Sequence, residues 1–162
     1  MNKEEIYEYI KSKNIWYEIT NHKAVFSMSE VDNVDLPYKE CDAKNLFVRD
    51  DKHKNYYLIT VKGDKRVNLK EFRLKNSTRP LSFANEEELM NILKVVPGSV
   101  SPFGILNDKE SKVKFFIDKD FYDEPGIIGV HPNENIATIW LKTQDLIDII
   151  KEHKNEVYIV GI

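Results

Sequence analysis

The sequence contains a single cysteine, Cys41, and no long run of apolar residues. One cysteine cannot form an internal disulfide, and Cys41 has no spaced cysteine partners for a zinc site. No run approaches the roughly 20 apolar residues that a membrane helix needs, and residues 1–5 are too polar for a signal peptide. We therefore expect a cytoplasmic protein with no metal site and no membrane contact, in which Cys41 is a small, semi-buried residue.

The motifs of several large enzyme classes are also missing. The chain has no GxSxG nucleophile elbow, no GxxxxGK[ST] phosphate loop and no HExxH zinc motif. Their absence disfavours the hydrolases, nucleotide-binding proteins and metalloproteases that depend on them, and we expect no cofactor.

The pattern of apolar residues predicts the fold class. At 162 residues, without repeats or linkers, the chain has the length of one domain, which we expect to span residues 1–162. Helical spacing predicts helices over residues 3–13, from Asn85 and from Thr143. Runs of β-branched and aromatic residues predict a hairpin of strands 43–49 and 56–61, and further strands at 113–117, 127–130, 136–141 and 157–160. The predicted fold is α+β with a mixed sheet.

Positive charge is concentrated in the middle of a chain whose net charge is −3. Residues 44–79 carry 11 basic and 4 acidic side chains, while the segments on either side are acidic. Such a segment could follow a phosphate backbone, although a solvated surface of ordinary lysines and arginines would show the same charge. The densest part of the segment contains Lys62, Lys65, Arg66, Lys70 and Arg73.

Three local features place polar or flexible residues where chemistry could occur. Lys44 and Asn45 lie in an otherwise apolar strand, where a lysine either snorkels to water or serves a site. The loop 98–104 has glycines that allow close backbone approach, and its amides could hold a carbonyl or a ribose, although a plain turn would also use glycine and proline. The third feature is the polar segment 131–135, which begins with His131 and separates two apolar strands.

The histidines alone do not identify a site. An isolated histidine at the end of a strand, as His131 is predicted to be, is commonly structural. We interpret His22, His53 and His153 as structural or solvent-facing, since no partners converge on them in the sequence.

Together these features resemble one family, the YbaK/ProX-type trans-editing deacylases, which are related to the insertion domain of prolyl-tRNA synthetases. The resemblance rests on the order and spacing of motifs along nearly the whole chain. The motifs are HKAVF at 22–26, KNLFV at 44–48, GDKRVNLK at 63–70, PGSVSPF at 97–103, ND at 107–108 and HPNENIAT at 131–138. Two departures are Lys23, where the family often has proline, and Trp140, which is bulky where relatives tend to be smaller.

The resemblance implies a fold and a reaction. The fold would be a mixed, mostly antiparallel, barrel-like sheet surrounded by helices. In the reaction, water attacks the ester between an amino acid and the terminal adenosine of tRNA, assisted by a ribose hydroxyl of the substrate. The segments at 97–103 and 131–133 resemble the branch that clears alanine from proline tRNA, and the cysteine-clearing branch is the near alternative.

The resemblance also implies roles for individual residues. Lys44 would contact the terminal phosphate or the ester oxygens, and Asn45 and His131 would border the amino-acid pocket. Backbone amides from Gly98 to Ser101 would hold the carbonyl or ribose. The full set of expected catalytic residues is Lys44, Gly98 and His131, and the expected substrate-binding residues are Asn45, Ser99, Val100, Ser101, Pro102 and the pocket wall Val25, Phe26 and Val31.

The implied partner is an aminoacylated tRNA, recognised at the acceptor end of proline tRNA, with prolyl-tRNA synthetase as a further candidate partner. A rival hypothesis is a non-catalytic tRNA-binding or regulatory module, which would retain the fold and the basic segment and lose turnover.

Overall fold

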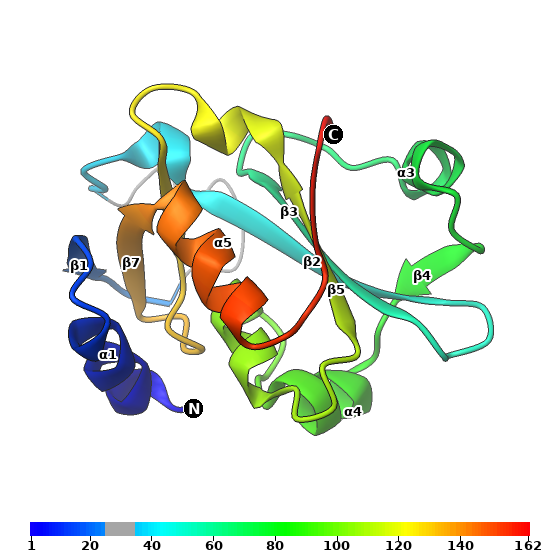
Figure 1. Ribbon diagram of the computed structural model, residues 1–162, viewed down its shortest axis with the longest axis horizontal. Helices are drawn as coiled ribbons and strands as arrows, with labels where there is room; N and C mark the ends of the chain where they lie inside the picture. Colours follow the sequence, from blue (N-terminus) through cyan, green and yellow to red (C-terminus); the bar gives the residue numbers. More distant parts are fainter. Residues whose placement is uncertain (25–34) are drawn as a thin grey trace.

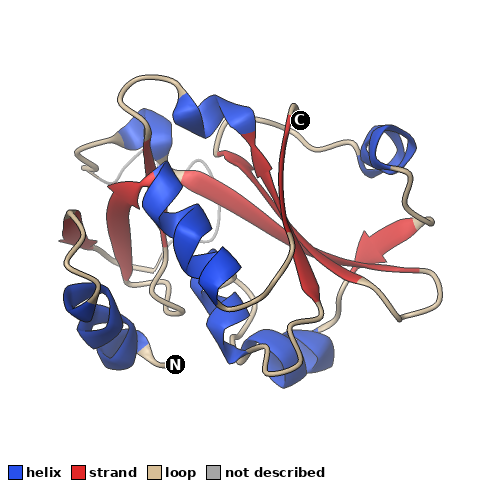
Figure 2. Cartoon of the chain, viewed as in Figure 1, coloured by secondary structure: helices blue, strands red, loops and turns tan. Residues whose placement is uncertain are grey.

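The computed structural model describes residues 1–24 and 35–162. Two sheets form the framework (Figures 1 and 2). The larger sheet has the strand order β4-β2-β3-β5-β8, and the smaller has the order β1-β7-β6. The β2–β3, β2–β4, β1–β7 and β6–β7 pairs are antiparallel, while β3–β5 and β5–β8 are parallel. The predicted α+β class with a mixed, mostly antiparallel arrangement is confirmed, and the described strands form two open sheets.

Each helix and strand predicted above is present, and β4 and α3 are elements that the sequence pattern did not predict. The strands are β1 (Tyr17–Asn21), β2 (Ala43–Asp50), β3 (Tyr56–Lys62), β4 (Leu81–Phe83), β5 (Val113–Asp118), β6 (Ile127–Val130), β7 (Ala137–Lys142) and β8 (Val157–Val160). The α-helices are α1 (Lys3–Ser12), α3 (Leu69–Asn76), α4 (Glu86–Glu88) and α5 (Thr143–Glu152). The shorter helical segments are η1 (Lys39–Cys41), η2 (Leu89–Leu93), η3 (Pro102–Asn107) and η4 (Lys119–Tyr122).

Local capping explains where two of the predicted helices begin. Asn2 accepts a hydrogen bond from the Glu5 amide at 2.8 Å, and the Glu5 carboxylate accepts one from the Asn2 amide at 3.2 Å. The same reciprocal arrangement joins Asn85 and Glu88 at the start of α4. Each such capping box satisfies amide donors that the first helical turn leaves unpaired.

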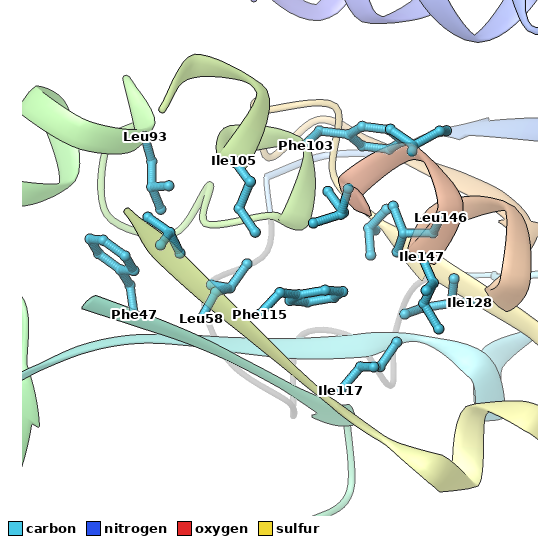
Figure 3. Close-up of a cluster of buried hydrophobic side chains, with 14 of the residues drawn as sticks. Phe47, Leu58, Leu93, Phe103, Ile105, Phe115, Ile117, Ile128, Leu146 and Ile147 are labelled. Carbon is cyan, nitrogen blue, oxygen red and sulfur yellow. The ribbon is translucent and has the colours of Figure 1, made fainter. Parts of the chain in front are cut away.

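The two faces of the larger sheet have separate apolar cores. On one face, strand residues pack against α5 and against the segments around Leu93 and Ile105, as Figure 3 shows. Phe115 and Leu58 are fully buried there, and each such side chain contributes about 1.5–3 kcal/mol relative to exposure. On the other face, Val48, Ile59 and Phe116 pack with Phe72 of α3. The sheet is therefore covered on both sides.

The smaller sheet contributes one face to the first core. Ile19, Ile139 and Val130 from its three strands belong to that core or pack against it. Because successive strand residues point to opposite faces, Thr20, Thr138 and Trp140 lie on the other face, which we call the outer face of the small sheet. No helix in the described part of the chain is long and apolar enough to cross a membrane.

Candidate functional site

The outer face of the small sheet brings together side chains from the N-terminal and C-terminal thirds of the chain. His131 directly follows β6, and its Nδ1 lies 3.0 Å from the carbonyl oxygen of Ala137 in β7. His22 directly follows β1, and its Nε2 lies 2.9 Å from Oγ1 of Thr138. The two imidazole rings are 6.1 Å apart, centroid to centroid. The predicted site residue His131 therefore has a neighbour, His22, to which the sequence analysis assigned no partners.

Burial disfavours the charged form of the His131 imidazole. Burial lowers the pKa of His131 below its usual value of 6.5, and the charge of nearby His22 adds to the decrease, while the hydrogen bond with Ala137 opposes it. A histidine with a lowered pKa is uncharged at neutral pH and can accept a proton or a hydrogen bond.

Trp140 and Gly129 form a cross-strand pair of the small sheet, and Trp140 lies two residues along β7 from Thr138. The indole Nε1 of Trp140 donates a hydrogen bond to Thr20 Oγ1 at 2.9 Å, and Tyr38 packs against the ring edge-on. A Cβ atom on Gly129 would lie 2.2 Å from Cζ3 of Trp140, so the ring occupies the space that a side chain at 129 would need. The bulky Trp140 is accommodated because its cross-strand neighbour is glycine.

Ser101 ties the glycine loop to His131. Its hydroxyl donates a hydrogen bond to the His131 carbonyl oxygen and accepts one from the Phe103 amide at 3.2 Å, which caps η3. Gly98 is exposed and has φ +89°, a conformation that favours glycine. Ser99 and Pro102 are buried and Val100 is half-buried. The loop and His131, predicted as separate features, are thus one connected structure.

Lys44 and Asn45 point to opposite faces of the larger sheet. Asn45 shares the face of Phe47, where its Oδ1 accepts a hydrogen bond from Thr60 Oγ1 at 2.6 Å. Lys44 shares the face of Val48, and its ammonium donates to the backbone carbonyl of Lys65. Because adjacent residues of a strand alternate in direction, the two side chains cannot line the same surface of β2.

The half-buried Lys44 ammonium lies among charged residues of the segment after β3. Burial lowers the pKa of Lys44, Arg66 adds to the decrease, and Asp64 opposes it. A desolvated ammonium beside another cation favours an anionic partner such as a phosphate or a developing oxyanion.

The basic segment divides into paired and solvent-facing residues. The Lys65 ammonium bridges the carboxylates of Asp118 and Asp120, and these hydrogen bonds raise its pKa although burial acts in the opposite direction. Arg66 and Lys70 are exposed, whereas Lys62 and Arg73 are half-buried. The exposed members of the predicted tRNA-binding set therefore lie just before and at the start of α3.

Asp42 is a titratable group that the sequence analysis did not single out. It precedes β2 and forms an isolated bridge with Gly129 of the small sheet. Burial raises the pKa of its carboxyl from 3.8 to about 7, although a hydrogen bond from the Ala43 amide acts in the opposite direction. An aspartate before a strand carries no local signal of burial, so only the long-range contact with β6 reveals it.

Some predictions fall on residues without a described position. Val25, Phe26 and Val31, the predicted pocket wall, lie outside the described residues. Within the described ranges, no group of three His, Cys, Asp or Glu side chains could hold a metal ion.

Comparison with known proteins gives a consistent result. The family profile of the aminoacyl-tRNA editing domain matches residues 22–149. The prolyl-tRNA editing protein ProX of Acetoanaerobium sticklandii is 37% identical over 139 residues, which cover 86% of this chain and 84% of that protein. The prolyl-tRNA synthetase associated domain-containing protein 1 of Mus musculus is 35% identical over 138 residues, covering 83% and 80%.

Solved structures share the fold. A protein described as a candidate trans-editing enzyme for prolyl-tRNA synthetase superposes with a TM-score of 0.68 at 16% identity, covering 99% of this chain and 96% of that one. The hypothetical protein APE2540 superposes with a TM-score of 0.69 at 16% identity, covering 96% and 97%. At this identity the likeness concerns the fold alone.

Proposed function

This chain belongs to the aminoacyl-tRNA editing domain family, and from that premise we propose that it is a free-standing deacylase that hydrolyses alanine from mischarged proline tRNA. The observation that carries the proposal is the joined arrangement of His131 and the glycine loop, held together by Ser101. It supplies an uncharged acceptor next to a loop in which Gly98 is exposed.

The proposed reaction needs no protein nucleophile. Water adds to the ester carbonyl carbon, the bond from that carbon to the ribose oxygen breaks, and a proton passes to the ribose oxygen. The products are alanine and tRNA with a free terminal hydroxyl. Because an aminoacyl ester is already activated, fixing its geometry and stabilising the oxyanion can supply the required acceleration.

The chain's residues have positioning roles in this proposal. Backbone amides between Gly98 and Ser101 hold the ester carbonyl or the ribose, and His131 borders the amino acid. Lys44 binds the terminal phosphate or the ester oxygens. These oxygens replace the Lys65 carbonyl as the hydrogen-bond acceptor of the Lys44 ammonium. Asn45 is held by Thr60 on the face of β2 opposite Lys44, so the two side chains do not border one site, and we assign the substrate contact to Lys44.

The proposed substrate is a tRNA acceptor end, and the proposed surface for the rest of the tRNA is the basic segment. Arg66 and Lys70 are its exposed members among the predicted residues, and Lys62, Lys65 and Arg73 support them from half-buried positions. Transient association with prolyl-tRNA synthetase would bring the enzyme to newly mischarged tRNA.

A deacylation panel tests this function. Purified protein is incubated with proline tRNA charged with alanine, cysteine, serine or proline, and release of the amino acid is followed. We expect alanine to be released far faster than proline, since a small site excludes the additional methylene groups of the proline ring. A preference for cysteine would assign the other branch of the family, and tight binding without release would favour the non-catalytic module.

A further inference from the structure

The hydrogen bonds of the two histidines determine which ring nitrogen carries the proton. A backbone carbonyl only accepts hydrogen bonds, so Nδ1 of His22 donates to the Lys23 oxygen at 2.7 Å and Nδ1 of His131 donates to Ala137. In a neutral imidazole the other nitrogen then has a lone pair and no hydrogen. In neutral His131, Nε2 is therefore an acceptor.

The two Nε2 atoms differ in what they contact. Nε2 of His22 lies 2.9 Å from the hydroxyl oxygen of Thr138, so both nitrogens of that ring are engaged in hydrogen bonds. The hydrogen bond of His131 involves its Nδ1, and within residues 1–24 and 35–162 its Nε2 has no hydrogen-bond partner. His131 therefore offers one open acceptor, and His22 and Thr138 stand beside it as a fixed pair.

An acceptor at this place selects among the polar groups of an aminoacyl-tRNA end. Phosphate and ester carbonyl oxygens are themselves acceptors and would face the Nε2 lone pair unfavourably. The α-amino group is a donor, and it is attached to the carbon next to the ester carbonyl. Because Ser101 holds the His131 backbone against the loop proposed to bind that carbonyl, the amino group would fall near the His131 ring.

We propose that His131 Nε2 accepts a hydrogen bond from the α-amino group of the esterified amino acid, and that His22 and Thr138 are positioning residues for His131. This inference rests on the proposed deacylase function and adds what the site recognises in its substrate. His22 fixes the end of β1 to Thr138 of β7, and Thr138 lies next to Ala137, the residue that orients the His131 ring.

Two esters on proline tRNA test the inference, one alanyl and one propionyl, because the propionyl group lacks the amino group and is otherwise similar in size. The ratio of kcat/KM for alanyl over propionyl ester is measured for wild type, His22→Ala and Thr138→Val. We expect the ratio to fall about tenfold or more in both variants. Thr138→Ser, which retains the hydroxyl, and His53→Ala, which changes an exposed histidine, should keep the wild-type ratio.

The alternatives give different results. An equal loss of activity on both esters would show that His22 and Thr138 only maintain structure, and would overturn the inference. A tRNA that ends in 2′-deoxyadenosine lacks the terminal 2′-hydroxyl. If His22→Ala and Thr138→Val lose their effect on that tRNA, while the ratio of alanyl to propionyl ester is unchanged, the acceptor binds the ribose. That result would also overturn the inference. If wild type releases no amino acid from any charged tRNA, the proposed function fails first and the inference fails with it.

Discussion

Lys44 is the residue whose role can be separated most clearly into stability and activity. The half-buried ammonium of Lys44 donates a hydrogen bond to the backbone carbonyl of Lys65, and burial lowers the pKa of Lys44. If it binds the terminal phosphate or ester oxygens, Lys44→Ala should lose most deacylation, on the order of 100-fold, because a charge-assisted contact disappears. We expect the melting temperature to change by only a few degrees, since the strand retains its paired register.

Lys44→Arg is the companion variant. A planar guanidinium keeps the charge but cannot reproduce the compact ammonium beside Arg66, so we expect it to be impaired too. Single-turnover rates and thermal melts of both variants are the measurements. An alanine variant with wild-type turnover and a lowered melting temperature would show that Lys44 only snorkels to water.

Gly129 gives a prediction about packing within the small sheet. A Cβ at this position would overlap Trp140 Cζ3 and Cε3, at 2.2 and 2.5 Å, so the indole or the strand must shift. Gly129→Ala should therefore lower the free energy of unfolding by about 1–3 kcal/mol, as overpacking of a core does. Urea unfolding measures the loss. In the double variant with Trp140→Phe the smaller ring should restore part of it, and strict additivity of the two changes would contradict the overlap.

At the scale of elements, α3 connects the basic segment to the sheet. Asn68 caps the helix, Phe72 anchors it in the second core, and Arg66 and Lys70 face solvent. Replacing Arg66 and Lys70 by glutamine should weaken tRNA binding and reduce the slope of log Kd against log salt by about one to two. Lys151→Gln with Lys154→Gln, which also removes two exposed charges, is the matched control.

Binding isotherms at several salt concentrations decide this prediction. An unchanged slope in the Arg66 and Lys70 variant would show that the segment is a solvated surface. A loss equal to that of the control pair would show that only net charge matters.

Elements with strong local signals were predicted correctly, and those without them were missed. The helical spacing of residues 3–13 and the β-branched and aromatic runs of β2 and β3 are present in neighbouring residues, and the structure confirms these elements. Helix α3 was not predicted, because its apolar residues are few and its pattern is dominated by charge. The parallel pairing of β3, β5 and β8 was also beyond local reasoning, since it depends on segments distant in sequence.

The same limit applies to the candidate site. His131 and the glycine loop were identified from their motifs, and Ser101 joins them across 30 residues. His22 was set aside because its partner Thr138 is 116 residues away. The burial of Asp42 likewise arises from contact with β6 and leaves no local pattern. Convergence of this kind is a property of the folded chain.

At the scale of the whole molecule, carboxyl groups of two kinds set how stability depends on pH. Interactions within the fold lower the pKa of Asp51, through its hydrogen bond with Arg79, and of Asp120, through its hydrogen bond with Lys65. Such groups stabilise the fold above their unfolded pKa of about 3.9 and lose this contribution as pH falls. Asp42 has the opposite sign, because burial raises its pKa to about 7.

The unfolding free energy of the Asp42→Asn variant should therefore increase relative to that of wild type as pH rises. Between the unfolded pKa of about 3.9 and the folded value of about 7, the native wild-type protein binds the proton that the unfolded chain releases, so its stability falls with increasing pH. Asparagine has no such proton. From pH 5 to pH 8 the difference in unfolding free energy between variant and wild type should grow by up to about 3 kcal/mol, at about 1.4 kcal/mol for each pKa unit crossed. Urea unfolding of both proteins at the two pH values measures this difference, and a constant difference would show that the Asp42 carboxyl titrates near its unfolded value.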